Sequence, residues 1–281
     1  MGYMHIENLY KNVDILMFKE CYALEKIHGT SAHISYKDGK VILFSGGEKF
    51  AKFEALFDKE KLKEKFEELF DYDVTIFGEA YGGSQQGMSA TYGKETKFVA
   101  FDVKVGDSWL NVPDAEDVTK KMGLEFVYYE KIKAEIFDID CARDYRSIQA
   151  ERNGIKEIKM REGVVLRPLK ELIRNDGKRI MSKHKRDEFK ETRTKREVDP
   201  KKLKVLEKAQ EIAKEWVTPM RLTHVLDKLG NPNEIEKTGV VIKAMIEDVF
   251  REAKGEIAES KEASTAIGRL TAKLYKNKIS K

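Results

Sequence analysis

The stretch Glu25-Lys26-Ile27-His28-Gly29-Thr30 is the part of this 281-residue chain around which the rest is organised. Apolar residues 22–24 precede it and the β-prone residues 33–36 follow it. This pattern predicts Lys26 at the end of a buried strand, in a tight turn closed by Gly29. A lysine beside a glycine can be approached closely by a ligand, and its neutral amine is a nucleophile. On the local sequence, a salt-bridged lysine in a turn is the alternative.

The composition is that of a globular protein with an unusual share of charge. Hydrophobic residues make up 41% of the chain, which is enough for a sizeable core, and charged residues make up 36%. Such a Lys- and Glu-rich composition is typical of heat-adapted proteins. The net charge of +4 does not by itself indicate nucleic acid, but 12 of the 27 residues from Lys178 to Lys204 are Lys or Arg, against 5 acidic ones.

The sequence disfavours zinc-binding, secreted and membrane proteins. Cys21 and Cys141 are far apart and form no C-x-x-C pair, which indicates a reducing compartment and no zinc site. The N-terminus lacks an apolar signal region, and no window approaches 18 apolar residues. We therefore expect a soluble, intracellular protein located in the cytoplasm, without a membrane partner.

The segments after the lysine stretch favour antiparallel strands. Asp38-Gly39 between two β-prone runs predicts a hairpin, and Asp58 is expected to cap an amphipathic helix over 59–70. Residues 74–77 are expected to form a buried strand that ends at Gly78-Glu79, where the carboxylate faces a ligand or caps a turn. Residues 84–92 are expected to form a polar loop.

The middle of the chain is less regular. Residues 97–103 predict a strand in which Phe101 and Asp102 point to opposite faces, and an aromatic residue there is usually core. Asp114 is expected to cap a short helix that ends near residue 122, and residues 124–129 are strand-like. Residues 138–160 give no assignment.

Two stretches of the third quarter carry charge on expected strands. Arg161-Glu162-Gly163-Val164-Val165 predicts a strand that opens with Glu-Gly. Lys183 and Lys185 lie on one face of another strand, where a phosphate between them would relieve their repulsion. An exposed edge strand protected by lysines is the alternative.

Helical periodicity replaces the strand pattern after Asp199-Pro200. Helices are expected over about 203–213 and 221–229, from about Glu234 or Gly239 to Ala253, and over 263–278, with Val240 among the inward residues of the third. The change predicts two domains, residues 1–198 and residues 199–281.

Taken in this order, the stretches resemble the covalent nucleotidyltransferase superfamily of ATP-dependent ligases and capping enzymes. Most of that superfamily has K-x-D-G at the lysine, whereas Lys26-Ile27-His28-Gly29 resembles the RNA ligase 2 family of phage RNA ligases and kinetoplastid RNA-editing ligases. The resemblance covers nearly the whole chain. It implies an α+β fold, namely a nucleotidyltransferase (ATP-grasp-like ligase) domain of antiparallel sheets with flanking helices, followed by a small all-helical C-terminal domain.

The resemblance also implies a reaction. An ATP-dependent RNA ligase joins a 3′-OH to a 5′-phosphate through lysyl-AMP and adenylylated RNA, with ATP and Mg²⁺ or Mn²⁺ as cofactors. The implied substrate is RNA with 3′-OH and 5′-phosphate ends, with a nicked duplex as the first expectation and single-stranded ends as the alternative, without an obligate protein partner. The first domain would be the adenylyltransferase, and the helical domain would bind RNA.

Site roles follow from the same resemblance. Lys26 is the expected nucleophile, Lys183 and Lys185 contact the α-phosphate, and Glu162 holds the metal. The implied nucleotide contacts are Glu25, Ile27, His28, Glu79 at the ribose, Phe101 stacked on adenine, and Asp102, which orients a neighbour. Arg221, at the start of a helix, is the expected RNA phosphate contact.

Two departures from the family pattern affect the expected nucleotide pose. Ser31 stands where the family usually has Asn, and Ser45 stands where it has Arg, so a contact is missing or comes from elsewhere, such as Lys49. The competing hypotheses are a DNA ligase, a capping guanylyltransferase and a non-catalytic RNA-end-binding protein. The helical tail disfavours the first two, and the retained Lys26, Glu79 and Glu162 disfavour the third.

Overall fold

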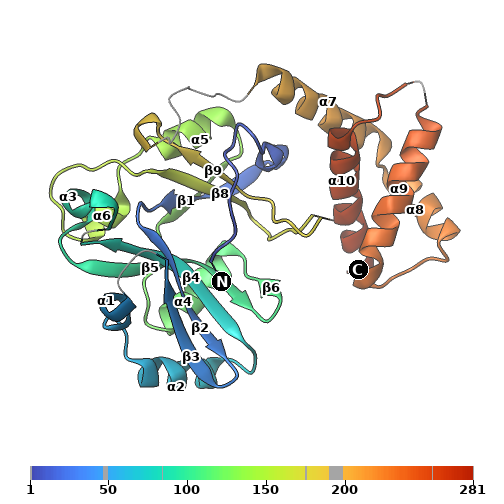
Figure 1. The fold of residues 1–281 in the computed structure, drawn as a ribbon. Coiled ribbons are helices and arrows are strands. Elements are labelled where there is room, and N and C mark those ends of the chain that lie inside the picture. The colour runs from blue at the N-terminus through green and yellow to red at the C-terminus, as the bar shows by residue number, and fades with distance from the viewer. Residues whose placement is uncertain are drawn as a thin grey trace. The chain divides into compact units, whose positions relative to one another are not determined.

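A computed structural model describes residues 2–46, 50–83, 85–174, 176–189, 199–254 and 256–280. The chain divides into two compact units, Met1–Arg196 and Glu197–Lys281. The described part of the first unit holds two antiparallel sheets with flanking helices, and that of the second is helical (Figure 1). The predicted α+β fold is therefore confirmed. Lys49 lies outside the described residues.

The first sheet carries the lysine stretch. Its order is β7 (Tyr129–Lys133), β1 (Glu20–Lys26), β8 (Gly163–Pro168) and β9 (Ser182–Lys185), with antiparallel neighbours. Strand β1 is central and apolar, and Ala23 and Leu24 are buried on it. Lys26 pairs with Gly163, which in turn pairs with Lys185. This register brings one end of β1, β8 and β9 to the same place.

The second sheet follows in the order β3 (Lys40–Ser45), β2 (Thr30–Lys37), β4 (Val74–Gly82), β5 (Thr96–Val105) and β6 (Ser108–Trp109). The hairpin at Asp38-Gly39 is confirmed, and both residues have positive φ, 49° and 72°. Strand β4 was predicted to end at Phe77 but continues to Gly82. A β-bulge between Phe77 and Gly78 lets pairing with β5 resume. Glu79 is thus a strand residue.

Helices cover this sheet, and one apolar cluster joins them to it. They are α1 (Phe50–Glu54), α2 (Lys59–Leu69) and α4 (Val112–Lys121), which contribute Phe53, Phe66 and Ala115 to a core that includes Ile34 and Ile76. The remaining helical segments of this unit are η1 (Asp14–Met17), η2 (Gln85–Gly87), α3 (Ser89–Tyr92), α5 (Ile136–Arg143), α6 (Ile148–Arg152) and η3 (Asp187–Phe189).

Local predictions here had mixed outcomes. The Asp58 cap of α2 is confirmed, since its side chain accepts a hydrogen bond from the Lys61 amide. The Asp114 cap was wrong, because α4 begins two residues earlier, after Asn111. The loop over 84–92 contains η2 and α3. In the range 124–129 only an isolated bridge at Phe126 and the first residue of β7 are extended.

The N-terminal segment, residues 7–12, packs along β9 (Figure 1). The Lys183 amide donates to the Glu7 carbonyl at 2.9 Å, and the Leu9 amide donates to the Lys183 carbonyl at 2.9 Å. Leu9 and Ile15 are fully buried. The outer edge of β9 is therefore covered at Lys183.

The second unit consists of α7 (Pro200–Trp216), α8 (Pro219–Lys228), η4 (Ile235–Lys237), α9 (Thr238–Glu252) and α10 (Lys261–Ile279). Asp199, Thr218 and Ser260 cap α7, α8 and α10 through their side chains. Val240, predicted to face inward, is 52% exposed, and its neighbour Val241 is buried instead. No helix of the described residues is both long enough and apolar enough to cross a membrane.

Candidate active site

Lys26 ends β1 with its ammonium group against a buried carboxylate. Its Nζ lies 2.9 Å from Oε2 of Glu162, and the Lys26 side chain is 23% exposed while that of Glu162 is 1% exposed. The pairing of Lys26 with Gly163 places the two side chains at neighbouring positions on adjacent strands. The predicted lysine at a strand end is thus reachable from solvent on one side and ion-paired on the other.

The turn after Lys26 lies tight against β4. A Cβ atom on Gly29 would stand 2.4 Å from the Ala80 carbonyl oxygen and 2.9 Å from Cγ of Glu79. Any residue other than glycine would push the turn away from β4. This contact brings Glu79 next to the lysine turn. Its contact with the ribose stays a prediction.

His28 joins the same carboxylate from the turn. Its Nδ1 lies 3.2 Å from Oε2 of Glu162, and its backbone amide donates to the hydroxyl of Tyr92 at 3.3 Å. Thr30 donates its hydroxyl to Oε1 of Gln85 at 2.9 Å. Segment 85–92, expected to be a loop, therefore holds the lysine turn in place.

Glu162 also binds a lysine of β9. Nζ of Lys185 lies 2.9 Å from Oε1 of Glu162, and the Lys185 side chain is only 10% exposed. A Cβ on Gly163 would stand 2.2 Å from the His184 carbonyl oxygen, so the Glu-Gly sequence allows β9 to approach. Lys183 lies on the same face of β9 as Lys185.

The two carboxylates of the site have opposite electrostatic environments. Burial would raise the pKa of Glu162, but contacts with His28, Lys26 and Lys185 outweigh it and lower that pKa to about 2. Burial raises the pKa of Glu79 to about 7, although Lys26 acts against it. One carboxylate is thus firmly ionised, and its neighbour titrates near neutral pH.

Glu25 points to the opposite face of β1 from Lys26. Its carboxylate accepts hydrogen bonds from the Ser147 hydroxyl and from the amides of Ile148 and Gln149 at the start of α6. Burial raises its pKa. The next turn residue, Ile27, is buried in the core. Neither side chain joins the Glu162 cluster, and their contact with a nucleotide stays a prediction.

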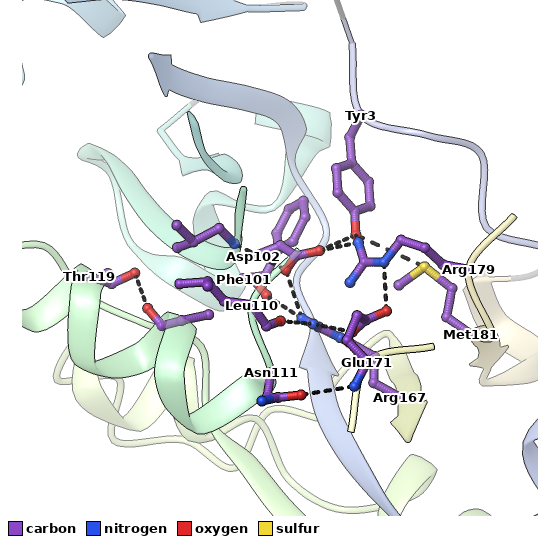
Figure 2. A network of polar contacts seen from close by, with 12 residues as sticks. Tyr3, Phe101, Asp102, Leu110, Asn111, Thr119, Arg167, Glu171, Arg179 and Met181 are labelled. Atoms are coloured by element: carbon purple, nitrogen blue, oxygen red, sulfur yellow. Dashed lines mark hydrogen bonds and ion pairs between the residues drawn. The ribbon is translucent and has the colours of Figure 1, made fainter. Parts of the chain in front are cut away.

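Asp102 lies in a separate buried network (Figure 2). It is fully buried, accepts from Nη1 of Arg167 at 2.9 Å and from the Tyr3 hydroxyl at 2.6 Å, and pairs with Arg179. Glu171 binds the same two arginines, at 2.7 Å from each. Two cations and two carboxylates therefore balance each other.

This network does not reach the lysine cluster. Arg167 stands five residues beyond Glu162, which is roughly 16 Å along an extended strand. Phe101 lies at the network's edge, where the Tyr3 ring meets it edge-to-face at 4.9 Å. The side-chain partners of Asp102 are Tyr3, Arg167 and Arg179. The nucleotide contacts of Phe101 and Asp102 stay predictions.

The second unit holds Arg221 on a pocket of about 360 Å³. Nη1 of Arg221 lies 2.9 Å from Oδ2 of Asp248, and its guanidinium stands over the Trp216 ring at 5.2 Å. Asp248 is buried and also binds Lys228 and Arg251. Arg221 therefore has protein partners, and its contact with RNA phosphate stays a prediction.

The donor set suits a hard cation bound mainly through its substrate. Within the described residues, no group of three or more His, Cys, Asp or Glu side chains could enclose a metal ion. Glu162 can offer one or two oxygens, and Mg²⁺ commonly takes one carboxylate, waters and substrate phosphates. The predicted ligand Glu162 fits such a site.

Comparisons with known proteins agree with this arrangement. Residues 19–185 match the model of the RNA ligase family. A search of curated proteins found no match. Among solved structures, the chain resembles Naegleria gruberi RNA ligase in a ligand-free mutant, with pyrophosphate, and in a mutant with ATP and Mn, each at 18% identity and a TM-score of 0.52.

The likeness to these structures is partial. It covers 67% of this chain, and 56% of the ligand-free protein or 57% of the other two. This chain therefore spans a little over half the length of the chains it resembles. At this identity the structures show a shared fold.

Proposed function

The chain belongs to the RNA ligase family, and from this premise we propose that it is an ATP-dependent RNA ligase that joins 3′-OH and 5′-phosphate ends. The observation that carries the proposal is the meeting of Lys26, Lys185 and His28 on the single carboxylate of Glu162. A nucleophilic amine, a second cation and a metal-binding oxygen thus lie within one cluster.

The reaction has three transfers. The Lys26 amine attacks the α-phosphorus of ATP, a P–N bond forms, and pyrophosphate leaves with the displaced bond's electrons. The AMP group then passes to an RNA 5′-phosphate and frees the lysine. Finally the RNA 3′-OH attacks the activated 5′-phosphate, a phosphodiester forms, and AMP leaves.

The residues of the cluster divide the work. Lys26 attacks, while Lys183 and Lys185 stabilise the charge that develops on the α-phosphate. A divalent cation on Glu162 would neutralise phosphate charge when bound. Glu79 binds ribose hydroxyls, and His28 assists the departure of pyrophosphate. Phe101 stacks on adenine, Glu25 with the adjacent backbone contacts the edge of the base, and Ile27 contacts the nucleotide.

We assign adenylyl transfer to residues 1–198 and RNA binding to residues 199–281. Arg221 is the proposed phosphate contact, and nicked duplex RNA is the proposed preferred substrate. The pocket at Arg221, with Trp216 beside it, supports this assignment.

The decisive experiment is an intact mass measurement after the protein is mixed with ATP and Mg²⁺. One added AMP is expected on the wild type and none on Lys26→Ala, while GTP should not label the protein. Labelling at another lysine, or by GTP alone, would overturn the assignment. Sealing of nicked duplex RNA is then compared with joining of single-stranded RNA and sealing of nicked DNA, because each alternative outcome identifies a different substrate.

A further inference from the structure

Strand β9 is a short strand whose backbone is bonded on both sides. It has only four residues, Ser182–Lys185, and it pairs with β8 on one side. Two of the four residues of β9 are Lys183 and Lys185, which the proposed mechanism needs. Something on the other side must fix the direction in which they point.

The N-terminal segment, defined here as residues 7–12, occupies that other side. Both backbone groups of Lys183 are bonded to it, the amide to Glu7 and the carbonyl to Leu9, each at 2.9 Å. In an antiparallel pair of strands, the backbone amide and carbonyl of every second residue point away from the partner strand. The segment therefore receives the groups of Lys183 that β8 cannot reach.

Asn12 fastens the start of the strand. Its Nδ2 donates to the Met181 carbonyl at 3.3 Å, and its own carbonyl accepts from the Ser182 hydroxyl at 2.6 Å. Asn12 is 8% exposed and Ser182 is fully buried. Three consecutive residues, Met181, Ser182 and Lys183, are thus tied to the segment, and solvent does not compete for these bonds.

We propose that the N-terminal segment is a positioning element for adenylyl transfer, and that Asn12 is its main positioning residue. The segment binds the backbone of β9 from the side opposite β8 and so orients the Lys183 side chain toward the α-phosphate. This proposal rests on the function proposed above. The segment lies before residue 19, where the family match begins.

The test is a double-mutant cycle on the rate of lysyl-AMP formation. Asn12→Ala removes the bond to the Met181 carbonyl and the bond that Oδ1 accepts from the Asp14 amide at 3.2 Å. It should lower the maximal rate roughly tenfold, the size expected for loss of the buried bond to Met181, and should change the half-saturating ATP concentration little. In a Lys183→Ala background the same substitution should lower the rate less than about twofold, because the group it positions is gone. Equal losses in both backgrounds would mean a general structural role and overturn the proposal.

A second readout does not depend on ATP chemistry. Amide hydrogen exchange over residues 182–185 should accelerate in Asn12→Ala while that of β1 stays unchanged. Unchanged exchange in β9 would show that the segment does not stabilise this strand. A wild type that forms no lysyl-AMP would overturn the proposed function and the positioning role together, whereas the exchange result would still decide whether the segment stabilises β9.

Two further variants serve as a substitute for Asn12→Ala and as a control. Ser182→Ala removes only the hydroxyl that binds the Asn12 carbonyl, and it replaces Asn12→Ala in both measurements if that protein does not fold. Tyr129→Phe removes a hydroxyl that donates to Glu116 at 2.7 Å in the same unit, and it should leave the rate and the β9 exchange unchanged.

Discussion

The Nζ atom of Lys26 lies 2.9 Å from the Oε2 atom of Glu162, so the proposed nucleophile and the proposed metal ligand form one ion pair. The pair cannot persist unchanged through the reaction, because an ammonium group does not attack phosphorus. A cation that binds Glu162 would compete with Lys26 for the same oxygen. In the proposed mechanism, metal binding would therefore be coupled to release of the lysine through this contact.

This coupling predicts the behaviour of Glu162→Gln. Loss of the carboxylate should lower the rate of lysyl-AMP formation by ~10²-fold or more and raise the Mg²⁺ concentration needed for half-maximal rate. The measurement is a Mg²⁺ titration of the rate in wild type and variant. An unchanged Mg²⁺ requirement would show that Glu162 only anchors the lysines.

Lys183→Ala and Lys185→Ala should each slow lysyl-AMP formation by ~10²-fold or more, because both cations stabilise charge on the α-phosphate in a partly dry site. Single-turnover rates at saturating ATP provide the comparison. Lys170→Ala, at an exposed position of the same unit, is the control. Wild-type rates in both variants would favour the edge-strand explanation, although residues 7–9 already cover that edge at Lys183.

Glu79 should make stability depend on pH. Its folded pKa of about 7 exceeds its ordinary value of 4.5, so the folded state holds a proton that the unfolded state has lost. The contribution is complete below pH 4.5 and is lost as the pH rises through 7, by about 2–3 kcal/mol between pH 5 and pH 8. Glu79→Gln lacks this loss, so the variant should gain stability relative to wild type between pH 5 and pH 8.

Urea unfolding at both pH values measures this difference, with Glu64→Gln on the exposed face of α2 as the matched substitution. A wild type and a Glu79→Gln variant that change in parallel would contradict the raised pKa.

Gly29→Ala should destabilise the first unit by about 1–3 kcal/mol, since its Cβ would overlap the Ala80 carbonyl oxygen. The displaced turn should also slow lysyl-AMP formation. Gly239→Ala is the control, because nothing lies within 4 Å of the added atom and the glycine is on a helix. Thermal unfolding of both variants decides the point, and equal midpoints would show that the turn can move freely.

Arg221→Ala should weaken the sealing of nicked RNA and spare lysyl-AMP formation, and a protein that ends at Glu197 should behave likewise. Wild-type RNA binding should fall steeply as salt rises. Arg221 also pairs with the buried Asp248, so unfolding must be measured alongside sealing. Lys243→Ala, at an exposed position on α9, is the control. Full sealing activity in the truncated protein would remove the RNA role from this domain.

Sequence patterns predicted the features that neighbouring residues determine. Asp38-Gly39 defines a hairpin and Asp58 caps a helix, because turn and cap geometry depend on a few adjacent positions. The lysine turn, the Glu-Gly strand and Lys185 were expected at one site from family order, and they do meet at Glu162.

The features that were missed join distant parts of the chain. Glu25 binds Ser147, 122 residues away, and Tyr3 binds Asp102, 99 residues away. No periodicity near Glu25 or Tyr3 indicates such a partner. The end of β4 was misjudged for a related reason, since pairing with β2 and β5 extends the strand through glycines that disfavour it locally.

The place of β1 between β7 and β8 has a consequence for biosynthesis. Residues 20–26 are synthesised well before their partners in β8, which begin at Gly163, and Leu9 precedes its partner Lys183 by a longer interval. At about 5–20 residues per second the wait is on the order of ten seconds. During that time β1 can pair with β7 once residue 133 has emerged, but its other edge stays open until β8 follows. A nascent chain should therefore need protection from aggregation at this edge until β8 and β9 have emerged.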